Sequence, residues 1–199
     1  MVSVKGRKKS EIFVVASIVL MLAVSGCLPV RHTPLVTGIT LKPGRYLTSY
    51  YQAPDFNPAA TSFQLEPFVV DKITGTAPQT FLPLFQQEVA QALEANGLKL
   101  TDTDSTCRLS GTIRRLRVSG LGLRFLLGRI SAHLEVAGAI IQGDQTLAAF
   151  EDRLSLSSPL NPGPPAPKEV EIILRRVARE FAHHLLTEML LPPARADSG

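Results

Sequence analysis

The residue of this chain best placed for covalent chemistry is Cys27, which follows Val24, Ser25 and Gly26. A cysteine thiol can accept a diacylglyceryl group as a thioether, and the small residues ahead of it let the backbone enter a peptidase. Cleavage between Gly26 and Cys27 would leave the modified cysteine at the start of the mature chain. More than one acyl chain at such a position gives stable membrane anchoring.

The residues ahead of Cys27 have the three-part arrangement of a signal peptide. A basic stretch from Lys5 to Lys9 precedes an apolar run of 13 residues from Ile12 to Val24. That run is shorter than the roughly 20 residues needed to span a bilayer. We therefore expect residues 1–26 to be removed. The alternatives are an uncleaved signal anchor, or an ordinary secretory peptide with an incidental cysteine.

The junction Val24-Ser25-Gly26-Cys27 resembles the lipobox of bacterial lipoproteins, which is usually an aliphatic residue, two small residues and cysteine. In enterobacterial lipoproteins an aspartate after the cysteine commonly means retention in the inner membrane. This chain has Leu28 there. The resemblance therefore implies a lipid anchor in the outer membrane, facing the periplasm, with the inner membrane as the alternative.

Charge and cysteine content exclude some classes of protein. The net charge is +4, but +3 of it lies ahead of Cys27, so the rest of the chain is nearly neutral. We therefore expect no nucleic-acid partner. The chain has only two cysteines, Cys27 and Cys107, which cannot form a disulfide framework.

The remaining chain divides by composition into a tether, a domain and a tail. Residues 27–60 hold the lipidated cysteine and a proline-rich segment, which predicts an extended tether. We expect one folded domain over residues 61–191 and a disordered tail over residues 192–199.

Hydrophobic periodicity predicts the elements of this domain. In chain order these are a strand over 63–70, a helix over 80–96, strands over 107–118, 129–141 and 146–156, and a helix over 168–191. We expect an α+β fold of order β-α-β-β-β-α. Its antiparallel sheet of about four strands carries both helices on one face.

This plan resembles that of small bacterial envelope lipoproteins, the YajG-like lipoproteins and related families of unknown function. The matching stretches are LEPFVVDKITG (65–75), FQQEVAQALEANGLKL (85–100), CRLSGTIRRLRV (107–118) and GRISAHLEVAGAIIQGDQTLAAFEDRLSLSS (128–158). The resemblance covers residues 61–190 as a pattern, and none of its motifs is catalytic. Cys107 and the long proline loop before the last helix depart from it. The resemblance implies an accessory role in envelope assembly or transport.

A search for catalytic or metal-binding groups gives only weak candidates. His133 and Glu135 share a strand face but lack a third ligand, and His183 and His184 point about 100° apart on a helix. Cys107 is best interpreted as a small buried hydrophobe. We therefore expect no enzyme activity, no metal and no cofactor.

Two clusters could contact a partner or a membrane. Five bulky apolar residues and an arginine lie at one predicted hairpin tip: Leu121, Leu123, Arg124, Phe125, Leu126 and Leu127. This tip either packs back on its own domain or forms a membrane or subunit contact. Arg114, Arg115 and Arg117 either meet lipid phosphates or an acidic partner, or lie on a solvated strand end.

The sequence thus favours a non-enzymatic module, held on the membrane through Cys27, that binds an envelope protein or a second copy of itself. Strand addition at a free sheet edge is one way to do so. The alternative is a lipid-binding accessory of a lipid-transport system.

Overall fold

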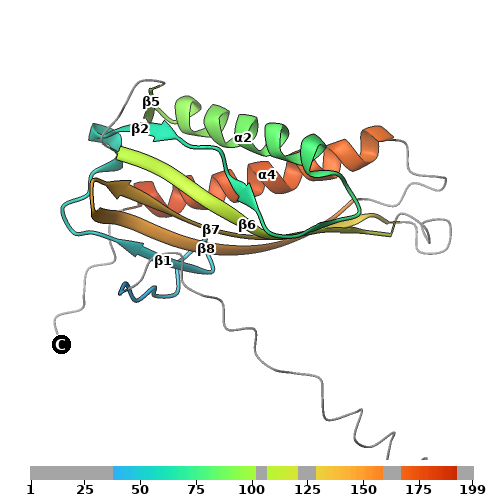
Figure 1. Ribbon diagram of the computed structural model, residues 1–199, viewed down its shortest axis with the longest axis horizontal. Coiled ribbons are helices and arrows are strands. Elements are labelled where there is room, and N and C mark those ends of the chain that lie inside the picture. The colour runs from blue at the N-terminus through green and yellow to red at the C-terminus, as the bar shows by residue number, and fades with distance from the viewer. Residues whose placement is uncertain (1–37, 102–106, 121–128, 159–166, 192–199) are drawn as a thin grey trace, which may run out of the picture. The chain divides into compact units, whose positions relative to one another are not determined.

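Three long antiparallel strands form the centre of the sheet (Figure 1). The structure is a computed structural model that describes residues 38–101, 107–120, 129–158 and 167–191. The central strands are β6 (Cys107–Ser119), β7 (Ser131–Gln142) and β8 (Gln145–Ser157). Gly143 and Asp144 form the two-residue turn between β7 and β8, with Gly143 at φ +58°. The strands predicted over 129–141 and 146–156 are thus confirmed as the two arms of a hairpin.

Short strands extend the sheet on both sides. The first predicted strand is broken into β2 (Ser62–Leu65), β3 (Val69–Val70) and β4 (Ile73–Thr74), which follow one another along β6 and run parallel to it. β5 (Lys99–Leu100) pairs with β2, and β1 (Ser49–Gln52) pairs with β8.

The sheet therefore has eight strands of mixed direction, and the expectation of four antiparallel strands is wrong. The reason is the helix that connects β4 to β6. A strand that follows a crossover helix returns in the same direction, so it pairs in parallel.

The first helix, α2 (Pro78–Ala95), confirms the helix predicted over 80–96. It starts two residues earlier because Pro78 occupies the first turn, where its missing N–H costs little. Gly97 follows the capping residue Asn96 and has a φ of +77°, a conformation that ends the helix. The N–H groups of Gly97 and Leu98 donate to the carbonyls of Glu94 and Leu93 at 3.0 and 3.1 Å. This pair of hydrogen bonds closes the last turn as a Schellman motif.

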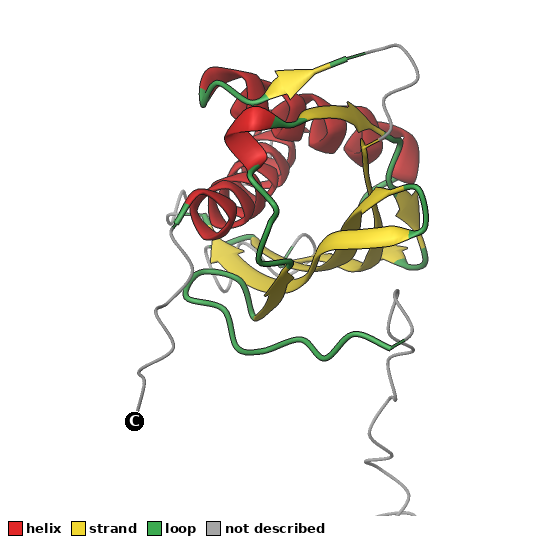
Figure 2. Cartoon of the chain, turned by 90° about the vertical axis from the view of Figure 1, so that its left-hand side faces the viewer, coloured by secondary structure: helices red, strands yellow, loops and turns green. Residues whose placement is uncertain are grey.

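The second helix, α4 (Pro167–Leu190), packs beside α2 on one face of the sheet, which curves around both helices (Figure 2). Five phenylalanine rings fill the space between the layers, with neighbouring ring centroids 5.1 to 6.4 Å apart. They are Phe68, Phe81, Phe85, Phe150 and Phe181. No helix in the described stretches is long and apolar enough to cross a membrane.

Two glycines on the core face of the sheet make room for these rings. Gly111 on β6 lies opposite Gly138 on β7. A Cβ atom on Gly111 would lie 2.3 Å from the Phe68 ring, and one on Gly138 would lie 2.4 Å from the Phe150 ring. Both rings therefore rest directly on the backbone.

Gly138→Ala should destabilise the domain by about 1–3 kcal/mol, the usual cost of overpacking a core. Urea unfolding measures the change. Phe150→Leu provides the control, because a smaller side chain relieves the clash of the new methyl group with the ring, while the methyl group's contact with the Ser110 carbonyl oxygen at 2.6 Å remains. In the Gly138→Ala background, Phe150→Leu should cost less than it does alone. Additive costs would show that the two sites do not interact.

Residues ahead of Thr61, predicted to belong to the tether, contribute to the folded domain. They form β1 and the short 3-10 helix η1 (Pro58–Ala60), and they bury Leu47 and Phe56. In the described stretches the buried core runs from Leu47 to Met189. A chain that starts at Leu28 therefore keeps that core.

Candidate functional site

A buried carboxylate joins the two helices. Glu88 on α2 is 3% exposed, and it accepts hydrogen bonds from Arg175 Nη1 and Arg179 Nε on α4, each at 2.5 Å. Burial alone would raise the pKa of Glu88. The hydrogen bonds from the two arginines, together with their positive charges, outweigh burial and hold this pKa below its usual range.

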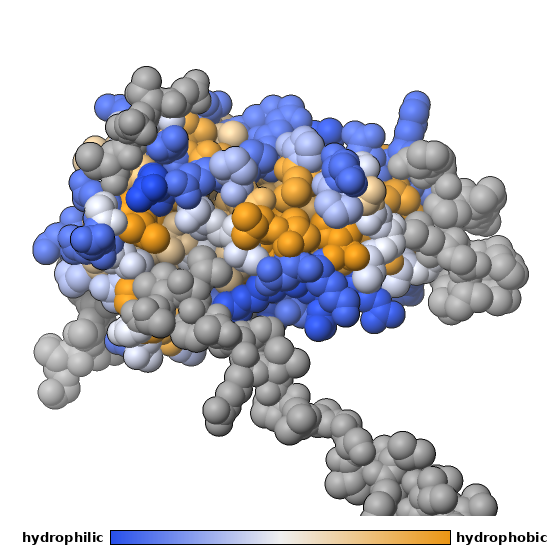
Figure 3. All heavy atoms as spheres, in the orientation of Figure 1, coloured by the Kyte–Doolittle hydropathy of each residue, from blue (hydrophilic) through white to orange (hydrophobic). Residues whose placement is uncertain are grey.

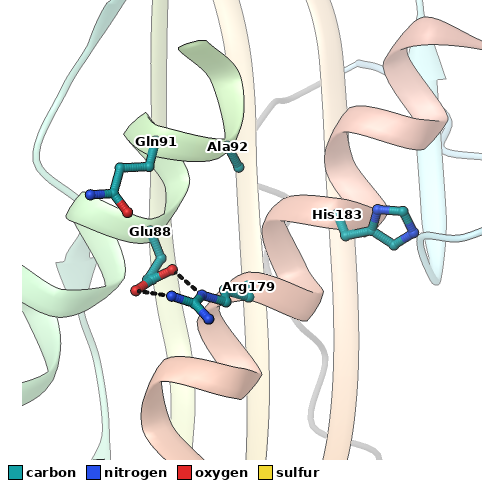
Figure 4. Close-up of a pocket in the computed structure, with 5 residues that line it drawn as sticks. All are labelled: Glu88, Gln91, Ala92, Arg179 and His183. Carbon is teal, nitrogen blue, oxygen red and sulfur yellow. Dashed lines mark hydrogen bonds and ion pairs between the residues drawn. The ribbon is translucent and has the colours of Figure 1, made fainter. Parts of the chain in front are cut away.

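A shallow depression of about 290 Å³ lies over this pair, between the helices. Its lining residues are Glu88, Gln91, Ala92, Arg179 and His183. Glu88 and Arg179 point toward each other, whereas the His183 ring points away from them (Figure 4). Glu88 and Arg179 thus bind each other rather than converging with His183 on a substrate position, which makes the ion pair a structural clamp between helices.

A second carboxylate ties residues 45–47, ahead of β1, to the end of α4. Glu188 Oε2 accepts from the backbone N–H groups of Arg45, Tyr46 and Leu47 at 2.7, 2.7 and 3.3 Å. Gly44 is required for this approach, because a Cβ atom there would lie 2.9 Å from Glu188 Oε2 and 2.6 Å from the Leu47 carbonyl oxygen.

Asp152 on β8 completes this attachment from inside the domain. Its carboxylate is 3% exposed and accepts from the backbone N–H and the hydroxyl of Thr48, both at 3.3 Å. The other carboxylate oxygen lies 2.9 Å from His184 Nδ1, and His184 Nε2 lies 3.6 Å from Glu180. The histidine is thus held between two carboxylates, and the nearby Thr48 hydroxyl bonds to Asp152. These hydrogen bonds fasten Thr48, which directly follows the residues bound by Glu188, to β8.

Glu188→Ala should free residues 45–47 and cost about 1–2 kcal/mol, because it removes charge-assisted hydrogen bonds that are partly exposed. Amide hydrogen exchange should become faster at Arg45, Tyr46 and Leu47. Gly44→Ala should have the same effect by displacing the carboxylate. Glu94→Ala, at an exposed position of α2, is the matched control. Unchanged exchange in both test variants would rule out the attachment.

Several residues singled out from the sequence lie outside the described stretches. These are Gly26, Cys27, Leu121, Leu123, Arg124, Phe125, Leu126 and Leu127. The lipidation site and the hairpin tip therefore remain predictions.

The remaining candidates are placed on the sheet. Cys107 is buried, and burial raises the pKa of its thiol to about 11, as suits a core residue. Glu135 pairs with Arg115 at 3.5 Å, and Arg114 pairs with Glu151 at 2.8 Å. No group of three or more His, Cys, Asp or Glu side chains that could hold a metal occurs in the described part of the chain.

Sequence reasoning missed Glu88 and Asp152, although both left a signal. Glu88 interrupts the apolar helical stripe between Phe85 and Val89, and Asp152 alternates with Phe150 and Leu154 on the apolar face of a strand. A charge at a core position requires a partner. For Glu88 the partners are Arg175 and Arg179, which lie one helical turn apart on α4.

No known family model matches the chain, and none of the curated proteins gives a significant match. Solved structures with a similar arrangement include bacterial lipoproteins. A minor lipoprotein from Acinetobacter baumannii is 14% identical, with 65% of this chain and 91% of that chain covered and a TM-score of 0.43. Rare lipoprotein B from Shewanella oneidensis is 19% identical, with coverages of 63% and 92% and a TM-score of 0.37.

Two further solved structures have a similar arrangement. PelC from Paraburkholderia phytofirmans, a dodecamer, is 12% identical, with coverages of 72% and 97% and a TM-score of 0.45. Protein XCC0632 from Xanthomonas campestris, of the DUF330 family, is 11% identical, with coverages of 68% and 86% and a TM-score of 0.47. These likenesses extend to lipoproteins and families of unknown function in general, rather than to the YajG-like group in particular. At these identities they carry no role over to this chain.

Proposed function

We propose that this chain is a lipid-anchored lipoprotein on the periplasmic face of the outer membrane, and that its domain is a non-enzymatic module that binds an envelope protein. The signal peptide and the lipobox-like junction support the anchor. Glu88 is engaged by two arginines and Asp152 by Thr48 and His184, which favours a structural role for these polar clusters and supports a binding role rather than a catalytic one.

One observation carries the binding role: an apolar strip along the edge of the sheet. Val69 on β3 is 59% exposed, whereas Leu65, Val70 and Ile73 beside it are partly buried and pack against the core. Figure 3 shows apolar surface in the middle of this face, bordered by hydrophilic side chains. Among the described strands, β3 and β4 pair with β6 alone. The segment just ahead of β3 is held by Gln86 on α2, which bonds to backbone groups of Glu66 and Phe68, so the edge open to a partner begins at β3. An exposed edge with apolar side chains is suited to strand addition by a partner.

Val69→Asp should remove the partner without unfolding the domain, because the side chain is already in solvent. The test is affinity purification from detergent-solubilised envelopes, with quantitative mass spectrometry. Ile172→Asp is the matched control, since Ile172 is 57% exposed on α4, away from the edge. We expect an envelope protein that is lost with Val69→Asp and retained with Ile172→Asp. Identical protein sets from both variants would contradict binding at this edge.

The same variants address self-association. If the partner is a second copy of the chain, light scattering of a chain that starts at Leu28 should give an oligomer, and Val69→Asp should give a monomer. A monomer at every concentration would leave an envelope protein of another sequence as the partner.

The lipid-carrier alternative requires space for an acyl chain between the helices and the sheet. Five phenylalanine rings occupy that space, so a bound acyl chain would have to displace them. We therefore expect no co-purifying phospholipid in native mass spectra of the chain from Leu28. Phospholipid bound at one molecule per chain would favour the carrier instead.

A further inference from the structure

Two neighbouring rows of side chains cross the central strands on the face of the sheet turned away from the helices. The strand register defines the rows as Arg117–His133–Ser155 and Arg115–Glu135–Arg153. Their alternate neighbours, such as Leu116 and Leu134, face the core and are buried. The rows are therefore fixed on the most extensively paired strands of the fold.

The charge of these rows is not balanced. Three guanidinium groups face one carboxylate, Glu135, which pairs with Arg115. Arg117 and Arg153 are exposed, and neither forms a salt bridge within the described stretches. Arg114 next to them shows the contrast, because its side chain is only 12% exposed and pairs with Glu151. Lys72, adjacent to β4, adds a further exposed cation.

The tether reaches the domain on this same side. In both ribbon views, residues 38–43 lie on the side of the sheet opposite the helices (Figures 1 and 2). Hydrogen bonds between Lys42 and Tyr50 and the Glu188 attachment hold this segment in place. Gly38 lies only 11 positions after Cys27, and 11 residues span at most about 40 Å. An anchor at Cys27 would thus keep Gly38, where the described chain begins, within about 40 Å of its membrane.

We propose that the basic face, defined as Lys72, Arg115, Arg117, His133 and Arg153, docks on the anionic phospholipid headgroups of the membrane that holds the anchor. The proposal rests on lipidation of Cys27 in the proposed function. Guanidinium groups bind phosphate oxygens in a bidentate manner and lose little hydration on doing so. An acyl anchor and a basic surface together hold a protein on a membrane more firmly than either does alone.

The test uses the chain that starts at Leu28, which retains the buried core and carries no lipid. We expect it to sediment with vesicles of equal parts phosphatidylglycerol and phosphatidylcholine, but not with pure phosphatidylcholine. Arg117→Gln/Arg153→Gln should lower the partition coefficient by about 30-fold, which corresponds to about 1 kcal/mol for each arginine near an anionic surface. Lys99→Gln/Arg176→Gln, which removes two exposed cations away from the basic face, should change it little. Added salt should weaken the binding.

Three outcomes would overturn the proposal. They are equal binding to both kinds of vesicle, equal losses in the two double variants, and binding of polyglutamate through Arg117 and Arg153 without vesicle binding. The last outcome would assign the face to an acidic protein.

The intact mass of the full chain separates this proposal from the proposed function. If Cys27 is acylated and the vesicle test fails, only the basic face is rejected. If Cys27 is not acylated, the proposed function fails whatever the vesicles show.

Discussion

Replacing Arg175 and Arg179 together by methionine should lower the free energy of unfolding by about 3 kcal/mol at neutral pH, because it leaves Glu88 as an unpaired buried charge. Urea unfolding measures the loss. Arg176→Met is the matched control, since Arg176 is exposed on the same helix and does not bind Glu88; it should change stability by less than about 0.5 kcal/mol.

The pH dependence of this variant should differ from that of the wild type. In the wild type the pKa of Glu88 is lowered in the folded state, so its contribution is complete above the unfolded value of 4.5 and is lost as the pH falls through the lowered folded value. In the double variant, burial raises the pKa of Glu88. The variant should therefore recover part of its lost stability as the pH falls through that raised value.

A third change separates the unpaired charge from lost packing. Glu88→Leu added to the double variant should restore most of the stability at neutral pH, since buried ion pairs can be replaced by apolar residues of similar volume. If the triple variant stays as unstable as the double variant, packing by the arginine side chains explains the loss.

Phe181→Ala should be equally severe and should cost about 3–5 kcal/mol, the usual range for loss of a buried ring. The Phe181 ring is fully buried and lies 5.3 Å from the Phe85 ring and 5.9 Å from the Phe150 ring, centroid to centroid. One substitution thus removes contacts with both the other helix and the sheet. The midpoint of urea unfolding measures the effect.

Ile172→Ala is the control for Phe181→Ala, because Ile172 lies on the same helix but is 57% exposed. It should cost far less. Comparable losses from both variants would mean that the helix itself, rather than ring packing, limits the stability of the domain.

Local patterns predicted the local structure well. The helix predicted over 80–96 and the adjacent strands predicted over 129–141 and 146–156 each depend on residues close together in sequence, and all are confirmed. Alternation of apolar and polar residues likewise located the three central strands.

Strand pairing and the polar clusters were harder to predict because they depend on distant residues. β2, β3 and β4 pair with β6 across the whole of α2, and β1 pairs with a strand about 100 residues later. The Glu88 clamp likewise joins residues 87 and 91 positions apart. The crossover helix could have predicted the parallel pairing, but nothing local to residues 45–47 indicates that they would bind Glu188.

The most direct test of the account is the intact mass and membrane fractionation of the full chain beside Cys27→Ala. We expect the wild type to lose residues 1–26, to carry acyl mass on Cys27 and to fractionate with the outer membrane, and we expect the variant to do none of these. A wild-type chain that keeps residues 1–26 without acyl mass, and stays with the inner membrane, would contradict the proposal of a lipid-anchored outer-membrane protein.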